Sequence, residues 1–195
     1  MSLVVAGKIA WAILVVTWYV LRLPHERQAR RTKLARNDRR GPEAIRLAIS
    51  FTGLGIIPFA YAVSGWPRMA AYPPHPILFG FGLASAAAAI VLFRLTHKAL
   101  GRMWSVSLQL KEGHSLVTEG VYRRLRHPMY SAFWLMAIAQ GLLLPNWIAG
   151  PAGAVGFGIL FFSRIGPEER MMEEAFGDRY RNYRARTWRV LPFVY

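Results

Sequence analysis

Long runs of apolar residues alternate along this chain with polar and basic segments. Three of the runs have about 20 residues, the length that an α-helix needs to cross the hydrocarbon core of a membrane. These runs are Leu3–Leu21, Ile45–Trp66 and Ile77–Leu95. Two shorter runs, Met129–Leu144 and Trp147–Phe162, flank the turn signal Pro145-Asn146. We therefore predict an all-α, polytopic membrane protein with five transmembrane helices, the last two of which form a helical hairpin.

Proline and glycine positions predict where several helices begin and end. Pro76 and Pro128 each precede an apolar run and suit the first turn of a helix. Gly166-Pro167 is expected to interrupt the chain after the hairpin, so that a separate cytoplasmic helix starts at Pro167 and breaks at Phe176-Gly177. Gln140, inside the first hairpin arm, is expected to donate a hydrogen bond between helices rather than to react.

The charge distribution predicts the orientation of the helices. The formal net charge is +15, and 23 of the 25 Lys and Arg residues lie in the segments 22–46, 94–126 and 164–195. Cytoplasmic loops hold most basic residues in membrane proteins, which places the N-terminus outside and the C-terminus in the cytoplasm. The positive charge is thus a topology signal, and we expect no nucleic-acid partner. Membrane lipids are the expected partners of the basic loop 23–44.

Composition excludes several other classes of protein. The chain has no cysteine and only five scattered histidines, so we expect neither a disulfide framework nor a metal site. The positive charge follows the first apolar run, which argues against a cleaved signal peptide. A soluble nucleotide-binding fold would show a glycine-rich turn after a strand, whereas Gly80 and Gly82 lie inside an apolar run and are expected to serve helix packing.

Polar residues flank the predicted hairpin at its cytoplasmic mouth. Arg126 and His127 precede it, and unpaired N–H groups at the start of that helix could hold an anion. Arg164 ends the second arm, where an arginine is costly unless it meets an anion. Two structural alternatives remain open. Arg126, His127 and Tyr130 could form a belt of side chains at the membrane interface, and Arg164 could form a helix-surface ion pair with Glu168.

The order of motifs from Leu100 to Pro192 resembles that of the isoprenylcysteine carboxyl methyltransferase family and its bacterial and archaeal relatives. The resemblance covers nearly half of the chain and depends on the combination of motifs. They are His114 with Leu116-Val117, Gly120-Val121-Tyr122-Arg123, Arg126-His127-Pro128-Met129-Tyr130, Glu168-Glu169, Phe176-Gly177, Tyr180 and Tyr183. The resemblance divides the chain into a three-helix membrane part, 1–99, and a cofactor-binding methyltransferase core, 100–195.

The resemblance implies an S-adenosylmethionine-dependent membrane enzyme and roles for individual residues. Arg126 and Arg164 match the arginines that face the substrate carboxylate, which makes them the expected catalytic residues. The implied cofactor-binding residues are His114, Leu116 and Val117 at the adenine, Tyr122, His127, Pro128 and Tyr130 at the ribose and methionine portions, and Glu169 with Glu168 from the tail.

The expected reaction is methylation of the carboxylate of an isoprenylcysteine-like or other lipophilic substrate that enters from the bilayer. A carboxylate is already ionised near neutral pH, so it needs orientation more than a base. Phospholipid N-methylation and thiol S-methylation are the alternative reactions. A membrane transporter or scaffold is the non-enzyme alternative, but transport predicts ionisable groups near mid-bilayer, and the apolar runs offer almost none.

Overall fold

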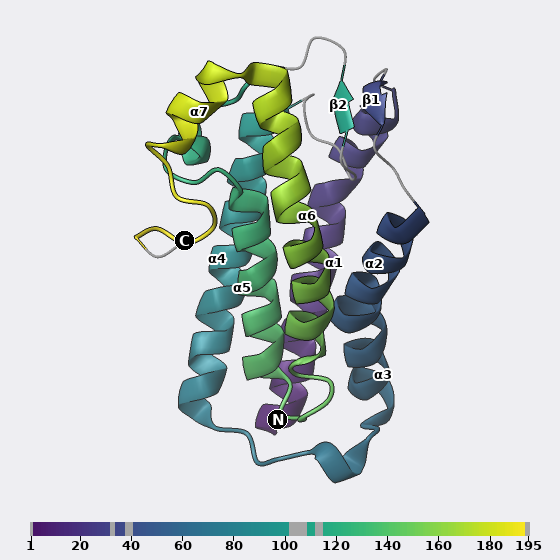
Figure 1. Ribbon diagram of the computed structural model, residues 1–195. Coiled ribbons are helices and arrows are strands. Elements are labelled where there is room, and N and C mark those ends of the chain that lie inside the picture. Colours follow the sequence, from purple (N-terminus) through teal and green to yellow (C-terminus); the bar gives the residue numbers. More distant parts are fainter. Residues whose placement is uncertain (1, 32–33, 38–40, 102–108, 112–114, 194–195) are drawn as a thin grey trace.

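Long helices run side by side in the protein, with the N-terminus at one end of the bundle and α7 at the other (Figure 1). The computed structural model describes residues 2–31, 34–37, 41–101, 109–111 and 115–193. The α-helices are α1 (Leu3–Arg31), α2 (Gly41–Phe51), α3 (Ile57–Ser64), α4 (Pro76–Leu100), α5 (Pro128–Leu143), α6 (Ala152–Phe176) and α7 (Asp178–Arg184). The shorter elements are the π-helix η1 (Thr52–Ile56), the 3₁₀ turns η2 (Arg68–Ala70) and η4 (Gly120–Arg123), and the strands β1 (Leu34–Asn37) and β2 (Gln109–Lys111).

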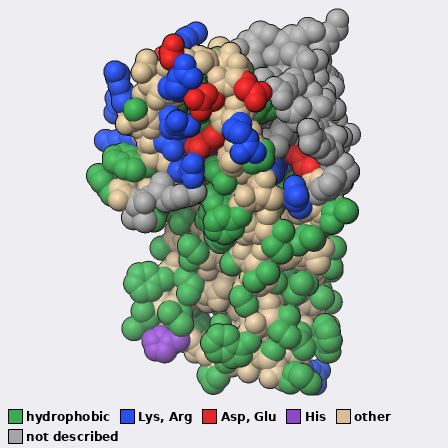
Figure 2. Space-filling model, viewed as in Figure 1, with side chains coloured by type: hydrophobic (Ala, Val, Ile, Leu, Met, Phe, Trp, Pro, Cys, Tyr) green, Lys and Arg blue, Asp and Glu red, His purple; other side chains and the backbone are tan. Residues whose placement is uncertain are grey.

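Among the described residues, three helical segments are long and apolar enough to cross a membrane, namely Leu3–Gln28, Glu43–Ser64 and Pro76–Leu100. Large apolar side chains on them face outward; Phe59, for example, is 61% exposed and Val63 is 73% exposed. Charged side chains gather at the end that holds α7, and hydrophobic side chains dominate the surface below it (Figure 2). The predicted membrane-type helical architecture is confirmed. The count of five crossings stays a prediction, because α5 is shorter and α6 joins apolar and charged halves.

A small antiparallel sheet of two strands, β1 and β2, is an addition to the predicted helical architecture. It joins the basic loop to the polar segment that follows α4, two regions without the alternating pattern that predicts strands. The basic loop is also shorter than the predicted range 23–44, since α1 continues to Arg31 and α2 starts at Gly41.

Local sequence signals correctly place several helix ends. Helices α4 and α5 begin at Pro76 and Pro128, as predicted. Gly177, with φ of 53°, separates α6 from α7. The predicted interruption at Gly166-Pro167 is wrong, because α6 continues through Pro167 without a break.

Close contacts between backbones hold the hairpin against α2 and η1. A Cβ atom on Gly53 would lie 2.2 Å from the carbonyl oxygen of Ala152, so only glycine fits there. Gln140 donates hydrogen bonds to the carbonyl oxygens of Gly53 and Ala149, at 3.0 and 2.7 Å, which confirms its predicted interhelical role. Gly80 faces open space, so the expectation that it serves packing is wrong, whereas Gly82 lies against Leu143.

The buried core joins the two predicted parts of the chain. Leu14 and Ala89 of the first part pack with Met136 and Leu143 of the second. Helix α4 packs against α1 and α5, and α6 packs against α2, η1 and α5. Helix α1 thus packs beside α5 and α2 beside α6, and residues of all four helices line the candidate site.

Candidate active site

A cavity of about 440 Å³ lies inside the bundle, a size typical of small-molecule sites. Its apolar wall combines aromatic and aliphatic side chains from α1, α2, η1, α4, α5 and α6, among them Trp18, Phe51, Leu54, Phe93, Phe133 and Phe157. Its polar wall combines side chains from the segment before α5 with others from α6. The cavity can therefore accommodate a ligand with both a long apolar part and charged groups.

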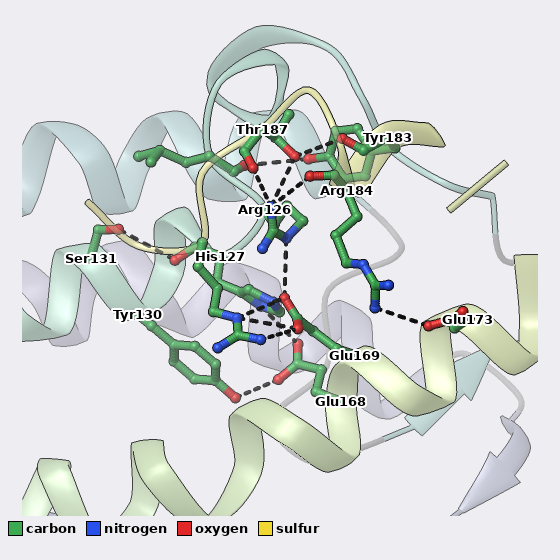
Figure 3. A network of polar contacts seen from close by, with 12 residues as sticks. Arg126, His127, Tyr130, Ser131, Glu168, Glu169, Glu173, Tyr183, Arg184 and Thr187 are labelled. Atoms are coloured by element: carbon green, nitrogen blue, oxygen red, sulfur yellow. Dashed lines mark hydrogen bonds and ion pairs between the residues drawn. The ribbon is translucent and has the colours of Figure 1, made fainter. Parts of the chain in front are cut away.

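His127 connects two neighbouring carboxylates of α6 at the polar wall. Its Nδ1 lies 3.7 Å from an oxygen of Glu168, and its Nε2 lies 3.4 Å from an oxygen of Glu169. The Tyr130 hydroxyl donates a short hydrogen bond to Glu168 (Figure 3). Because α6 continues through Pro167, the two glutamates occupy consecutive helical positions and reach different neighbours.

The electrostatic environment favours the charged forms of all three groups. Burial opposes ionisation of Glu168, but the hydrogen bond and charge of His127, together with Arg164 and Tyr130, outweigh it and lower the pKa of Glu168 to about 2. Burial also opposes ionisation of Glu169, and His127, Arg189 and Arg126 lower its pKa well below the usual value. In return, the two carboxylates outweigh the burial of His127 and raise its pKa.

Arg126 fastens the C-terminal segment to the site. Its Nε donates to Glu169 at 3.1 Å, and its Nη1 donates to the carbonyl oxygens of Arg184, at 3.0 Å, and Thr187. Arg189 completes the cluster with a 2.7 Å hydrogen bond from Nη2 to Glu169. Glu169 thus lies between cationic groups from two segments of the chain, 126–127 and the C-terminal segment, and acts as a buried counter-ion.

Arg164 reaches the cavity from α6 and meets an anion, as its depth requires. Its Nη2 lies 3.6 Å from an oxygen of Glu43 in the first turn of α2, and both side chains are nearly fully buried. The sequence offered Glu168 as the structural partner of Arg164. The structure instead shows an ion pair between two helices, from Arg164 to Glu43, although the charge of Arg164 also acts on Glu168.

The structure brings most of the predicted site residues to one cavity. Those that line it are Leu116, Val117, Tyr122, Arg126, His127, Tyr130, Arg164 and Glu168. Pro128 and Glu169 do not line it; Pro128 starts α5, and Glu169 lies behind the wall that Arg126 and His127 form. His114 lies outside the described residues. The roles of all these residues stay predictions.

Sequence reasoning missed several residues at the site. Trp18 and Arg22 line the cavity from α1. Glu43 pairs with Arg164 on the cavity wall, and Arg189 pairs with Glu169 behind the wall. Glu43 and Arg189 are far in sequence from the residues that they contact in this cavity region, so no local pattern pointed to them. Tyr180 belongs to a recognised motif, although its place on the cavity wall had no sequence signal.

Two tyrosines of α7 close the polar end of the cavity. The Tyr183 hydroxyl donates a 2.7 Å hydrogen bond to the carbonyl oxygen of Tyr122. Tyr180 is 2% exposed, and its hydroxyl has no hydrogen-bond partner among the described residues. A buried hydroxyl without a partner is costly, so its position on the cavity wall favours a ligand as the partner.

The raised pKa of His127 predicts a pH-dependent contribution to stability. A raised pKa means that protonated His127 stabilises the fold fully below its ordinary value of 6.5, and that this contribution disappears as the pH rises through the folded-state value. Replacing His127 by asparagine should therefore lower the unfolding temperature most at pH 5 to 6, and progressively less as the pH rises and His127 loses its proton in the folded protein. Thermal unfolding of both proteins in detergent across this range measures the difference, and a difference independent of pH would contradict the prediction.

The chain is similar in sequence to the members of one enzyme family. The sequence model of the isoprenylcysteine carboxyl methyltransferase family matches residues 75–174, about half of the chain. Protein-S-isoprenylcysteine O-methyltransferase B of Arabidopsis thaliana is 34% identical over 122 residues, which are 62% of either chain. The corresponding enzyme of Schizosaccharomyces pombe is 32% identical over 89 residues, 46% of this chain and 38% of that one.

A solved structure shares the fold. The chain superimposes on the eukaryotic intramembrane Ras methyltransferase ICMT with a TM-score of 0.55 and 24% sequence identity, over 82% of this chain and 55% of that one. The chain thus spans a little more than half of the length of the Arabidopsis relative and of this solved structure, and 38% of the Schizosaccharomyces pombe enzyme. Glu43 and Arg189 lie outside the residues that the family model matches.

Proposed function

Because the chain belongs to the isoprenylcysteine carboxyl methyltransferase family, we propose that it is an integral membrane methyltransferase that uses S-adenosylmethionine to methylate a carboxylate of an isoprenylcysteine-like or other lipophilic substrate. One observation supports this function above the others. A single cavity joins a wall of charged and polar side chains, including Arg164 and Glu168, to an aromatic interior between membrane-type helices.

The residues at the polar wall fit the chemical groups of S-adenosylmethionine. That cofactor supplies, when bound, an electrophilic methyl group on a positively charged sulfur. The ionised Glu168 suits its amino group, aromatic faces such as that of Tyr130 suit the positive sulfur, and the unpartnered hydroxyl of Tyr180 suits a polar group. Leu116 and Val117 provide an apolar surface for the adenine.

The two predicted catalytic arginines separate into different roles. Arg126 uses Nε and Nη1 to hold Glu169 and the C-terminal segment, so we assign to it the support of the polar wall. Arg164 lines the cavity at the junction between polar and apolar walls, where a fork of donors suits a carboxylate. We therefore assign the acceptor carboxylate to Arg164. Glu169 supports the cofactor site through Arg126 and His127 rather than by contact.

The lipophilic part of the substrate would enter between α1 and α2. Val15 and Trp18 of α1 line the cavity, as do Phe51 of α2 and Gly55 of η1. Elsewhere α1 packs against α4 and α5, and α2 packs against α6. The π-helix η1 lies at this side, and π-helical turns often occur at functional sites. In this arrangement the charged end of the bundle, the active site and the C-terminus are cytoplasmic, and the N-terminus lies outside.

Methyl transfer with the purified protein tests this function. With a radiolabelled methyl group on S-adenosylmethionine and S-prenylated cysteine derivatives as acceptors, we expect the label in a base-labile methyl ester. Base-stable label in a phospholipid or thiol acceptor would instead support N- or S-methylation. No binding of S-adenosylmethionine by calorimetry, with a folded protein, would contradict the enzyme and favour a transporter or scaffold.

A further inference from the structure

Two of the arginines that line the cavity, Arg126 and Arg164, are each held by a buried glutamate that does not line it. Glu169 holds Arg126 at 3.1 Å, and Glu43 lies 3.6 Å from Arg164. Both residues of the first pair lie within the residues that the family model matches. The second pair joins α6 to α2, and of its two residues only Glu43 lies outside the residues that the family model matches.

Glu43 is placed to act on Arg164 from the cavity-lining face of α2. Leu47 and Ser50 line the cavity four and seven positions after Glu43, which is the spacing of one helix face. Glu43 lies in the first turn of α2, where the helix dipole favours a carboxylate, and is 5% exposed. The carboxylate thus approaches the guanidinium from beyond the cavity wall.

The packing of α2 against α6 does not depend on the ion pair alone. A buried ion pair loses in desolvation much of what it gains in attraction, and apolar replacements are often equally stable. Close backbone contacts already hold this helix to α6, since a Cβ on Gly156 would lie 2.8 Å from the carbonyl oxygen of Ile49. The main effect of the Glu43 carboxylate is therefore to fix the position of the Arg164 guanidinium.

Resting on the proposed function, we propose that Glu43 is the positioning residue of the acceptor site, which holds the Arg164 guanidinium in place for the carboxylate of the substrate. An arginine side chain has many rotamers, and fixing it before binding lowers the cost of ordering it when the acceptor arrives. Glu43 therefore affects the acceptor and leaves the cofactor site, formed around Glu168 and His127, unchanged.

Replacing Glu43 by glutamine tests this role. We expect kcat/KM for the prenylated carboxylate to fall about tenfold, mainly through a higher acceptor KM, because a tenfold effect corresponds to the loss of one well-placed contact. The dissociation constant of S-adenosylmethionine, measured by calorimetry, should not change. Glu173→Gln is the matched control, since Glu173 pairs with Arg181 and Arg184 on the exposed side of α6 and should leave both quantities unchanged.

A double-mutant cycle distinguishes positioning from a general structural role. In an Arg164→Gln background, Glu43→Gln should have no further effect on methyl transfer. An unchanged acceptor KM in Glu43→Gln, an equal loss of cofactor affinity, or a further loss in the Arg164→Gln background would each overturn the role of Glu43. Absence of any methyl ester with the wild-type protein would instead contradict the proposed function itself, and this inference with it.

Discussion

Replacing Arg164 by lysine is expected to lower methyl transfer to a lipophilic carboxylate by about 10²-fold, while the protein stays folded and still binds its cofactor. Lysine keeps the positive charge, so Glu43 retains a counter-ion and the buried pair is not broken. It lacks the planar fork of donors that can bind both oxygens of a carboxylate. Initial rates with a prenylated cysteine derivative, with calorimetry of S-adenosylmethionine, measure the two effects separately.

Arg170→Lys is the matched control for this experiment. Arg170 is exposed on the same helix, six positions along, and does not line the cavity. Its replacement should leave the rate of methyl transfer unchanged. Full activity of Arg164→Lys with an unaltered acceptor KM would show that Arg164 does not orient the acceptor, and would shift that role to Arg126.

The sequence predicted those parts of the fold that depend on local signals. Pro76 and Pro128 begin helices because the first turn does not need their missing N–H groups. Gly177 ends α6 because its positive φ suits glycine. Gln140 was correctly assigned to an interhelical hydrogen bond, since a polar side chain between packed membrane helices needs a partner.

The wrong prediction at Pro167 shows where a local rule fails. Proline inside a helix costs about 3 kcal/mol in isolation, because it cannot donate a hydrogen bond and crowds the preceding turn. Here α6 packs against α2 and α5 on one side of Pro167. On the other side Glu169 forms ion pairs with Arg126 and Arg189, so tertiary contacts hold the helix together on both sides.

The sequence predicted those residues of the candidate site that belong to motifs, but not those that depend on tertiary contacts. His127 and Glu168 belong to motifs that the sequence resemblance singled out, and the structure places both on the cavity wall. Glu43 and Arg189 have no motif, and their importance depends on contacts with Arg164 and Glu169 that only the folded chain creates. A single sequence does not reveal such pairs, because a charged residue near a basic segment resembles any solvated surface charge.

Replacing Glu169 by glutamine is expected to have the largest effect on stability, a loss of about 3–5 kcal/mol in the free energy of unfolding. The substitution removes the negative charge that Arg126, Arg189 and His127 share, and leaves these cationic groups near one another in a largely buried site. The segment from Thr187 to Val190 should then open more often, because Arg189 loses its partner and only the hydrogen bonds to residues 124–131 still hold it. Thermal unfolding in detergent measures the first effect, and faster trypsin cleavage after Arg186 and Arg189 measures the second.

Glu168→Gln is the matched control, because Glu168 is the neighbouring residue and has a different environment. It lines the cavity and contacts His127 and Tyr130 rather than the C-terminal segment. Its replacement should weaken binding of S-adenosylmethionine about tenfold or more, while trypsin cleavage of the C-terminal segment stays slow. If the two variants instead lost stability and cofactor affinity to the same extent, the two glutamates would act as one unit. The division between a carboxylate that meets the ligand and one that holds the wall would then be wrong.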